Sequence, residues 1–138
     1  MKITRAGSGA SKSGPAEYFT GEVWIDELTA APYASDVRVV MVTFAPGART
    51  AWHTHPNGQF LRIASGTGRV QKAGEGIVEV HPGDVIWFEP GERHWHGAAP
   101  DKIMTHLAVQ RADQTGNAAS WQEQVSDSEY LGARNAGA

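Results

Sequence analysis

Short runs of strand-forming residues, each closed by a turn signal, constrain the fold of this chain more than any other feature of its sequence. The runs are rich in Val, Ile, Phe, Trp and Thr, and they cover 37–44, 49–55, 59–64, 67–72, 76–80, 85–88, 93–97 and 103–110. Pro, Gly and Asn between them supply a fixed or a positive φ where the chain reverses, at Pro46-Gly47, Pro56-Asn57-Gly58, Ser65-Gly66, Gly74-Glu75-Gly76, Pro82-Gly83-Asp84 and Pro90-Gly91. Eight short strands joined by tight turns predict an all-β fold, either a barrel or a double-sheet jelly roll.

The two ends of the chain differ from this middle part. Residues 7–14 are small and polar, so we predict a flexible segment that follows a short edge strand. A similar tail begins at Asp113, and 132–138 is expected to fray. Within the tail, 120–131 is predicted to form one or two short helical turns. Two of its aromatic side chains are expected to pack on the body of the domain: Trp121 and Tyr130.

Composition excludes several classes of protein. The chain has 138 residues, of which 41% are hydrophobic and 20% charged, so it is expected to fold as one domain, 1–138. A net charge of -3, from 12 basic and 15 acidic residues mixed along the chain, argues against nucleic acid or an anionic membrane as a partner. The start lacks the apolar run of a secretory signal and no stretch is long enough to span a membrane, so a cytoplasmic location is expected. Cysteine is absent, so a metal would have to rest on His, carboxylate or amide groups.

Four side chains are spaced to bind one metal ion. His53 and His55 are two residues apart, so on a strand both rings project from the same face. Gln59 follows a turn that brings its amide oxygen back toward that face, and His94 comes from a distant strand. Three imidazoles and one amide would leave coordination positions open for substrate, as in a catalytic site. The alternative is that the first two histidines are a surface pair on an exposed strand.

Further polar side chains are candidates for the chemistry. His106 and Gln110 share one face of the last strong strand, where they would act as an acid or base and as a hydrogen-bond donor if that face looks inward. The alternative is that they face solvent on an amphipathic edge. His96 has the parity of His94 and points inward on the same reasoning, unless it packs in its strand against Trp95 or Trp87.

Other residues carry weaker expectations. Val40, Val42 and Phe44 share one parity and would form an apolar pocket wall, although such residues are more often plain core. Thr50 faces away from the first histidine by strict alternation, but a bulge there would turn its hydroxyl inward. Residues expected to be exposed and without function are a loop histidine and three rim arginines: His81, Arg49, Arg62 and Arg93.

The spacing of these residues resembles the paired motifs of the cupin superfamily. The two blocks read Gly47-x5-His53-x-His55-x3-Gln59-x6-Gly66 and Gly83-Asp84-x4-Glu89-Pro90-Gly91-x2-His94. The resemblance implies a single cupin domain, a double-stranded β-helix or jelly-roll barrel with its core at about 37–110, and short C-terminal helical turns. Gln stands where the family usually carries Glu, and Glu89 and Ala98 replace the usual Pro and Asn. A ligand set without an acid leaves the ion its full charge, which makes it a stronger Lewis acid and removes one candidate base.

A closer resemblance covers more of the chain. Residues 14–21, 46–56, 91–100 and 104–108 are similar to the bacterial manganese-dependent cupin hydroxynitrile lyases. This resemblance implies reversible cleavage of a cyanohydrin such as mandelonitrile into an aldehyde or ketone and hydrogen cyanide. It implies four metal ligands, His53, His55, Gln59 and His94. Its further site residues match His106, Gln110, His96 and Thr50.

The resemblance also implies one divalent metal per chain, manganese first, with iron, cobalt, nickel or zinc as alternatives. A homodimer or homotetramer is expected on the same ground. Two other functions stay open at this point. One is an oxidative metal cupin, a dioxygenase at the same ligands, and the other is a cupin that binds a small molecule without catalysis.

Overall fold

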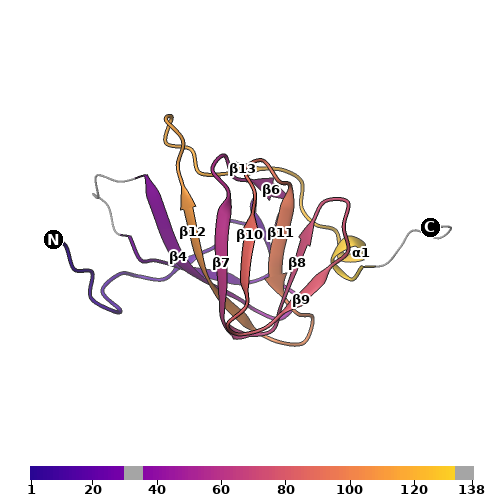
Figure 1. Cartoon of the computed structure of the whole chain (residues 1–138). Helices are drawn as coiled ribbons and strands as arrows, with labels where there is room; N and C mark the ends of the chain where they lie inside the picture. The colour runs from indigo at the N-terminus through magenta and orange to yellow at the C-terminus, as the bar shows by residue number, and fades with distance from the viewer. Residues whose placement is uncertain (30–35, 133–138) are drawn as a thin grey trace.

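The computed structural model describes residues 1–29 and 36–132, and two curled antiparallel sheets enclose its core (Figure 1). In the first sheet the strands follow the order β1 (Lys12–Ser13), β3 (Val23–Glu27), β4 (Val37–Phe44), β12 (Met104–Arg111), β7 (Gln59–Gly66) and β10 (Val85–Phe88). The second sheet follows the order β13 (Ser120–Trp121), β6 (His53–Thr54), β11 (His94–Ala98), β5 (Arg49–Thr50) and β2 (Phe19–Thr20), and β8 (Gly68–Lys72) joins β11 to β9 (Val78–Val80). The predicted all-β barrel is confirmed.

The core lies between the two sheets because their inward side chains are apolar at every second position. On β4 these are Val42 and Phe44, on β7 Leu61 and Ile63, and their neighbours on β12 include Met104. Strand β11 is an exception, since all five of its residues are buried. One of its faces looks into the barrel, and the C-terminal segment covers the other.

Two glycines let strands approach closely where a side chain could not fit. Gly66 ends β7 with φ +79°, and a Cβ there would lie 1.9 Å from the carbonyl oxygen of Ile103. Gly97 pairs with Arg49 across β11 and β5, and its Cβ would lie 2.4 Å from the carbonyl oxygen of Ala48. Only glycine is compatible with these contacts.

The ends of the chain are more ordered than the sequence predicts. No strand precedes residue 7, so the predicted edge strand is wrong, and β1 lies inside the segment predicted to be flexible. Trp121 belongs to a strand, β13, and not to a helical turn, because it pairs with His53. The predicted turn does form at α1 (Asp127–Tyr130), where a capping box of Ser126 and Glu129 satisfies free backbone donors. The predicted fraying of 132–138 falls almost wholly outside the described residues.

Arg49 is buried, so its assignment as a solvated rim charge is wrong. Only 5% of the residue is exposed. Its guanidinium donates to the carbonyl oxygen of Val125 at 2.6 Å, pairs with Asp127 at 2.8 Å and lies 4.6 Å from the ring of Tyr130. Arg93 is partly covered too, since its guanidinium lies 4.2 Å from the Trp52 ring. The C-terminal segment folds back over both side chains, which the local sequence did not indicate.

We expect Arg49→Ala to lower the free energy of unfolding by about 2 kcal/mol, because it leaves the buried carbonyl of Val125 without a donor. Asp127→Asn removes the same ion pair from its exposed side, and is expected to cost less than about 1 kcal/mol. Urea denaturation of both variants measures the difference. Equal losses would show that the ion pair, and not the carbonyl, holds the C-terminal segment.

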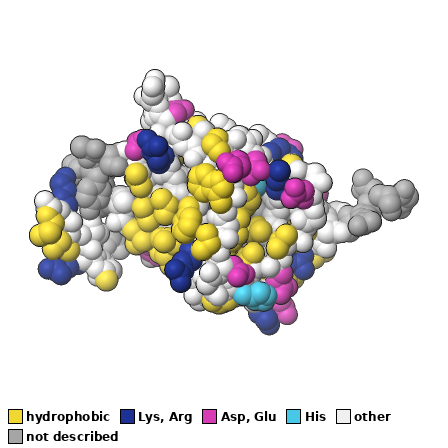
Figure 2. Space-filling model, viewed as in Figure 1, with side chains coloured by type: hydrophobic (Ala, Val, Ile, Leu, Met, Phe, Trp, Pro, Cys, Tyr) yellow, Lys and Arg dark blue, Asp and Glu magenta, His cyan; other side chains and the backbone are white. Residues whose placement is uncertain are grey.

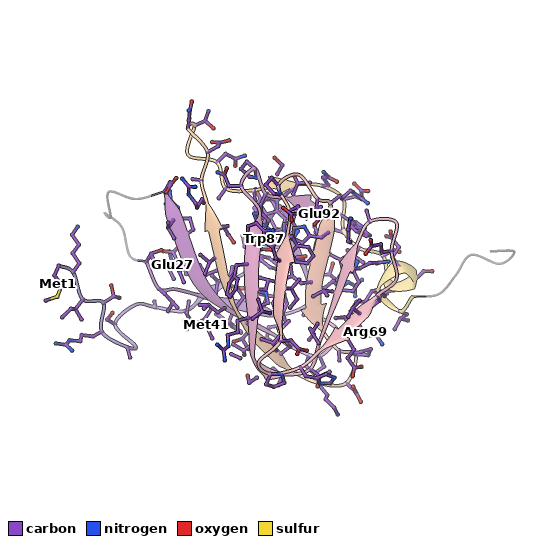
Figure 3. The ribbon with its side chains drawn as sticks, in the orientation of Figure 1. Met1, Glu27, Met41, Arg69, Trp87 and Glu92 are labelled. Atoms are coloured by element: carbon purple, nitrogen blue, oxygen red, sulfur yellow. The ribbon has the colours of Figure 1, made fainter. Side chains whose placement is uncertain are left out.

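The outer face of the first sheet is unusually apolar, as Figure 2 shows over β12, β7 and β10. Trp87 pairs with Phe60, which pairs with Val109, which pairs with Val39, so one apolar row crosses the sheet. Trp87 is half exposed on this face (Figure 3). In the described part of the chain, no helix is long and apolar enough to cross a membrane.

Candidate metal centre and its cavity

The structure brings the four predicted ligand side chains together inside the barrel. His53 starts β6, Gln59 starts β7 and His94 starts β11, while His55 follows β6 directly. His53 and His94 are paired residues of neighbouring strands, with ring centroids 4.3 Å apart. The ring of His55 lies 4.9 Å from that of His53 and 5.4 Å from that of His94. All four residues are at most 3% exposed, so the exposed surface pair considered above is excluded.

Each of the three rings is held by a backbone carbonyl. The bonds run from Nδ1, and they are His53 to Ala51 (2.9 Å), His55 to Ala118 (2.7 Å) and His94 to Glu92 (2.8 Å). A neutral imidazole that donates from Nδ1 carries its lone pair on Nε2. This arrangement is the usual support of metal-binding histidines, because it fixes both the tautomer and the ring orientation.

Gln59 provides the sharpest indication that a cation fits here. Its Oε1 lies 3.1 Å from Nε2 of His94, while its Nε2 donates to Gln110 at 2.9 Å. Because Nδ1 of His94 already donates to Glu92, two lone pairs face each other across that gap. Two buried acceptors at this distance repel each other unless a cation lies between them. In addition, Nε2 of His55 is buried without a hydrogen-bond partner. Buried acceptor atoms without donors fit a metal-binding site in this part of the barrel.

Burial keeps the three rings neutral. It is the largest cause that lowers the pKa of His53 and of His55, and it lowers the pKa of His94 to about 3. For His53 the neighbouring His94 and His55 lower the pKa further. At neutral pH the rings therefore offer lone pairs without first losing a proton.

A second pair of histidines lies beside this cluster. His106, on β12, contacts His96, on β11, with Nε2 of the first 2.9 Å from Nδ1 of the second. Burial lowers the pKa of His106 to about 4 and that of His96 well below its usual value. The remaining ring nitrogens, Nδ1 of His106 and Nε2 of His96, are buried without a partner. The pair is therefore neutral and has one N–H and one lone pair left to offer.

The metal-binding potential of the cluster extends to His96. Ring nitrogens of His53, His94 and His96 lie within 4.8 Å of one another. The sequence instead placed His55 in the ligand set. The two assignments agree on His53 and His94 and differ in the third imidazole, which is His55 in one and His96 in the other. Alanine variants separate them (Discussion).

The metal-free protein is expected to lose stability as the pH falls below about 6.5. Five buried histidines have lowered pKa values in the folded state: His53, His55, His94, His96 and His106. As the pH falls, these histidines are protonated first in the unfolded chain. Each one therefore lowers the free energy of unfolding by about 1.4 kcal/mol per pH unit, until the pH reaches its pKa in the folded state. For His106 and His94 these lower limits are about 4 and about 3.

Urea midpoints of chelated protein between pH 7.5 and 5 measure this loss. His81→Gln is the matched control, because His81 is exposed and is expected to leave the profile unchanged. A midpoint that does not change over this range would contradict the neutral, buried state of the cluster.

A cavity of about 200 Å³ opens beside both histidine groups. All but two of the site residues that the sequence singled out line this cavity. The lining residues among them are Val40, Val42, Thr50, His53, His55, Gln59, His96, His106 and Gln110. His94 does not line the cavity. It contacts Gln59, which does, and its ring stacks on that of Phe88 with centroids 3.7 Å apart. Phe44 does not line the cavity, so its place in the pocket wall is wrong. It is fully buried in the core, 5.3 Å from the ring of His106.

Thr50 faces the cavity, and its hydroxyl accepts a hydrogen bond from the backbone N–H of His96 at 3.2 Å. The predicted strand 49–55 is interrupted at 51–52, between β5 and β6. This break resets the alternation of side chains, so Thr50 and His53 share a face although their parity differs.

The sequence did not predict one part of the cavity wall. Residues of the N-terminal segment, β3 and β13 complete it, namely Pro15, Tyr18, Phe19, Ile25 and Trp121. Aromatic residues near both ends of the chain were the only signal, because nothing in the local pattern indicates that the two ends meet.

Together, the fold and the site define a β-barrel protein with a histidine cluster in its interior, suited to bind one metal ion. The family described as the cupin domain matches residues 40–110. The chain belongs to the cupin family.

Similar proteins agree with this assignment. An (R)-mandelonitrile lyase of Granulicella tundricola is 56% identical over 131 residues, which are 94% of this chain and 98% of that protein. A cupin-like protein of Thermotoga maritima, known from its crystal structure, is 36% identical with a TM-score of 0.80 and covers 94% of this chain and 95% of its own. A polyketide cyclase of Streptomyces resistomycificus, at 21% identity and a TM-score of 0.71 over 94% and 90% of the two chains, shares the fold.

Proposed function

We propose that this chain is a metal-dependent hydroxynitrile lyase, which reversibly cleaves a cyanohydrin such as mandelonitrile into an aldehyde or ketone and hydrogen cyanide. The observation that carries this proposal is the small, mainly apolar cavity with a neutral histidine pair beside a cluster of metal-binding side chains. The relative named (R)-mandelonitrile lyase supports it.

The proposed ligands of one divalent ion are His53, His55, Gln59 and His94. Manganese is the first candidate, and iron, cobalt, nickel and zinc suit the same donors. When bound, such an ion supplies a Lewis acid that lowers the pKa of a substrate hydroxyl, and the neutral ligands leave it its full charge. The three carbonyl bonds to Nδ1 hold the rings in the orientation that binding requires.

The histidine pair accounts for the protons. In the cleavage the hydroxyl loses a proton, the bond between the carbinol carbon and cyanide breaks with its electrons passing to cyanide, and cyanide takes up a proton. In either tautomer, His96 and His106 together keep one lone pair and one N–H besides their mutual bond. The pair can therefore accept the hydroxyl proton and return one to cyanide, with no net change in charge.

Two neighbouring side chains support these steps. Gln110 accepts from Gln59 through Oε1, so its own N–H groups remain to hydrogen-bond a leaving cyanide. Thr50 holds the backbone of His96 and thereby the position of the pair. Both are proposed as site residues on these contacts.

Elemental analysis of purified protein, combined with cyanide release from mandelonitrile, tests the proposal. We expect about one metal ion per chain, release that stops on chelation, and release that returns on adding Mn²⁺. Oxygen uptake with catechol or flavonol substrates, without cyanide release, would favour the dioxygenase instead. Ligand binding without turnover would favour the non-catalytic cupin.

We also propose that the chain forms a homodimer or homotetramer and acts in the cytoplasm. The apolar outer face of the first sheet supports self-association (Figure 2). Molar mass by light scattering checks it, and Trp87→Glu, which places a charge in that face, is expected to reduce the mass. A wild-type protein with the mass of one chain would contradict the proposal.

A further inference from the structure

The cavity has two different walls and one polar end. One wall is aromatic and comes from segments near the two ends of the chain, with Tyr18, Phe19 and Trp121. The facing wall is aliphatic and belongs to the first sheet, with Ile25, Val40, Val42 and Ala108. The histidines form the polar end. A substrate that presents its reacting group to the histidines would place its remaining substituent between the two walls.

The aromatic wall is rigid. The ring of Trp121 stacks on that of Tyr18, with centroids 4.6 Å apart and planes at 17°. It also stacks on His53, at 4.5 Å and 29°, and lies 5.9 Å from the ring of Phe19. Its backbone is paired with His53 through β13 and β6. An indole held on several sides cannot turn away to admit a bulkier or differently shaped group.

The two terminal segments that carry this wall are joined to each other. Gln124 donates to the carbonyl oxygens of Ala16 and Glu17, both at 2.9 Å, and accepts from the hydroxyl of Thr20 at 3.0 Å. The C-terminal segment is further fixed by Trp52, whose backbone N–H donates to the carbonyl oxygen of Glu123. The stacked pair of Tyr18 and Trp121 is therefore built into the fold.

From this arrangement we infer that Trp121 and Tyr18 are specificity-determining residues, which select cyanohydrins with a flat aryl substituent over those with small aliphatic ones. The inference rests on the proposed lyase function and adds to it the residues that choose the substrate. Both faces of the Trp121 indole are covered, by Tyr18 and by His53, so this wall can offer a substrate the edge of the indole. A planar ring between an aromatic and an aliphatic wall gains apolar contact on both of its faces, and an edge-to-face contact with the indole adds to the area that it buries. A methyl group in the same place leaves much of the cavity unfilled.

The test compares kcat/KM for mandelonitrile and for acetone cyanohydrin in Mn²⁺-loaded protein. Trp121→Leu is expected to lower the ratio of the two values about 10-fold, because an aliphatic side chain cannot make an edge-to-face contact with an aryl ring. Trp121→Phe keeps a ring and is expected to retain most of the ratio. Trp24→Leu is the matched control, since Trp24 is exposed on β3 and is expected to change nothing. Metal content is measured for every variant, because Trp121 touches His53.

Tyr18→Leu is the second variant, and it provides the test if Trp121→Leu does not fold. It is also expected to lower the ratio of the two kcat/KM values. Binding of benzyl alcohol by calorimetry provides a readout without turnover, and the leucine variants are expected to weaken it at least 5-fold. If wild-type protein cleaves neither cyanohydrin but binds benzyl alcohol through Trp121, the lyase proposal fails and the aryl site stands. An unchanged ratio together with unchanged benzyl alcohol affinity in both leucine variants would overturn the inference.

Discussion

Replacing His55 with alanine is expected to empty the metal site, whereas replacing His96 with alanine leaves it loaded. Nε2 of His55 is buried without a partner, and the ring, which the carbonyl of Ala118 fixes, lies 4.9 Å from that of His53. His96 is engaged through Nδ1 with His106. Elemental analysis should find the metal content of His55→Ala reduced from about one ion per chain to near zero, because the loss of one of four ligands leaves an incomplete site.

This comparison decides between two ligand sets that the geometry brings within reach. His53, His94 and His96 have ring nitrogens close enough to share an ion, so distance alone would favour His96 as the third imidazole. Loss of metal in His96→Ala with retention in His55→Ala would replace the proposed set. His81→Ala, on the exposed surface, controls for the general effect of removing an imidazole. Thermal unfolding with and without Mn²⁺ gives an independent measure, since only a loaded site raises the melting temperature.

His106→Ala is expected to lower kcat for mandelonitrile cleavage about 10²- to 10⁴-fold while the metal content stays at its wild-type value. The variant removes one half of the proton-handling pair and leaves Nδ1 of His96 without its 2.9 Å partner. Substrate binding depends mainly on the apolar walls, so KM is expected to change much less than kcat. Steady-state kinetics of cyanide release measures both values.

A neighbour of the histidine pair, Gln110, provides the control. Gln110→Ala removes a hydrogen-bond donor but no titratable group, so its effect on kcat is expected to be smaller than that of His106→Ala. A non-catalytic cupin would bind its ligand with the same affinity in both variants, and neither the wild-type protein nor the variants would release cyanide. If His106→Ala retained wild-type kcat, the proposed proton transfer through the pair would be excluded.

The spacing of turns and strands predicted the middle of the fold well. β4 and β10 begin and end where the pattern of β-forming residues places them, and β7, β8, β11 and β12 differ by at most two residues at either end. Period-two alternation and the strong conformational preferences of Pro and Gly act locally, so they can be read from neighbouring residues. The strands near the ends, β1, β2, β3 and β13, were missed because they are short or depend on pairing with distant partners.

The sequence by itself determined which side chains could meet a metal. His53 and His55 are two apart on an extended segment, and the turn before Gln59 returns the chain to the same place, so three of the four donors follow from local geometry. Only the tertiary structure decided what supports and encloses them. The carbonyl of Ala118 that fixes His55 lies 63 residues away, and Trp121 reaches the cavity because β13 pairs with β6. Contacts between distant segments depend on how the whole chain closes its core, and no local preference encodes them.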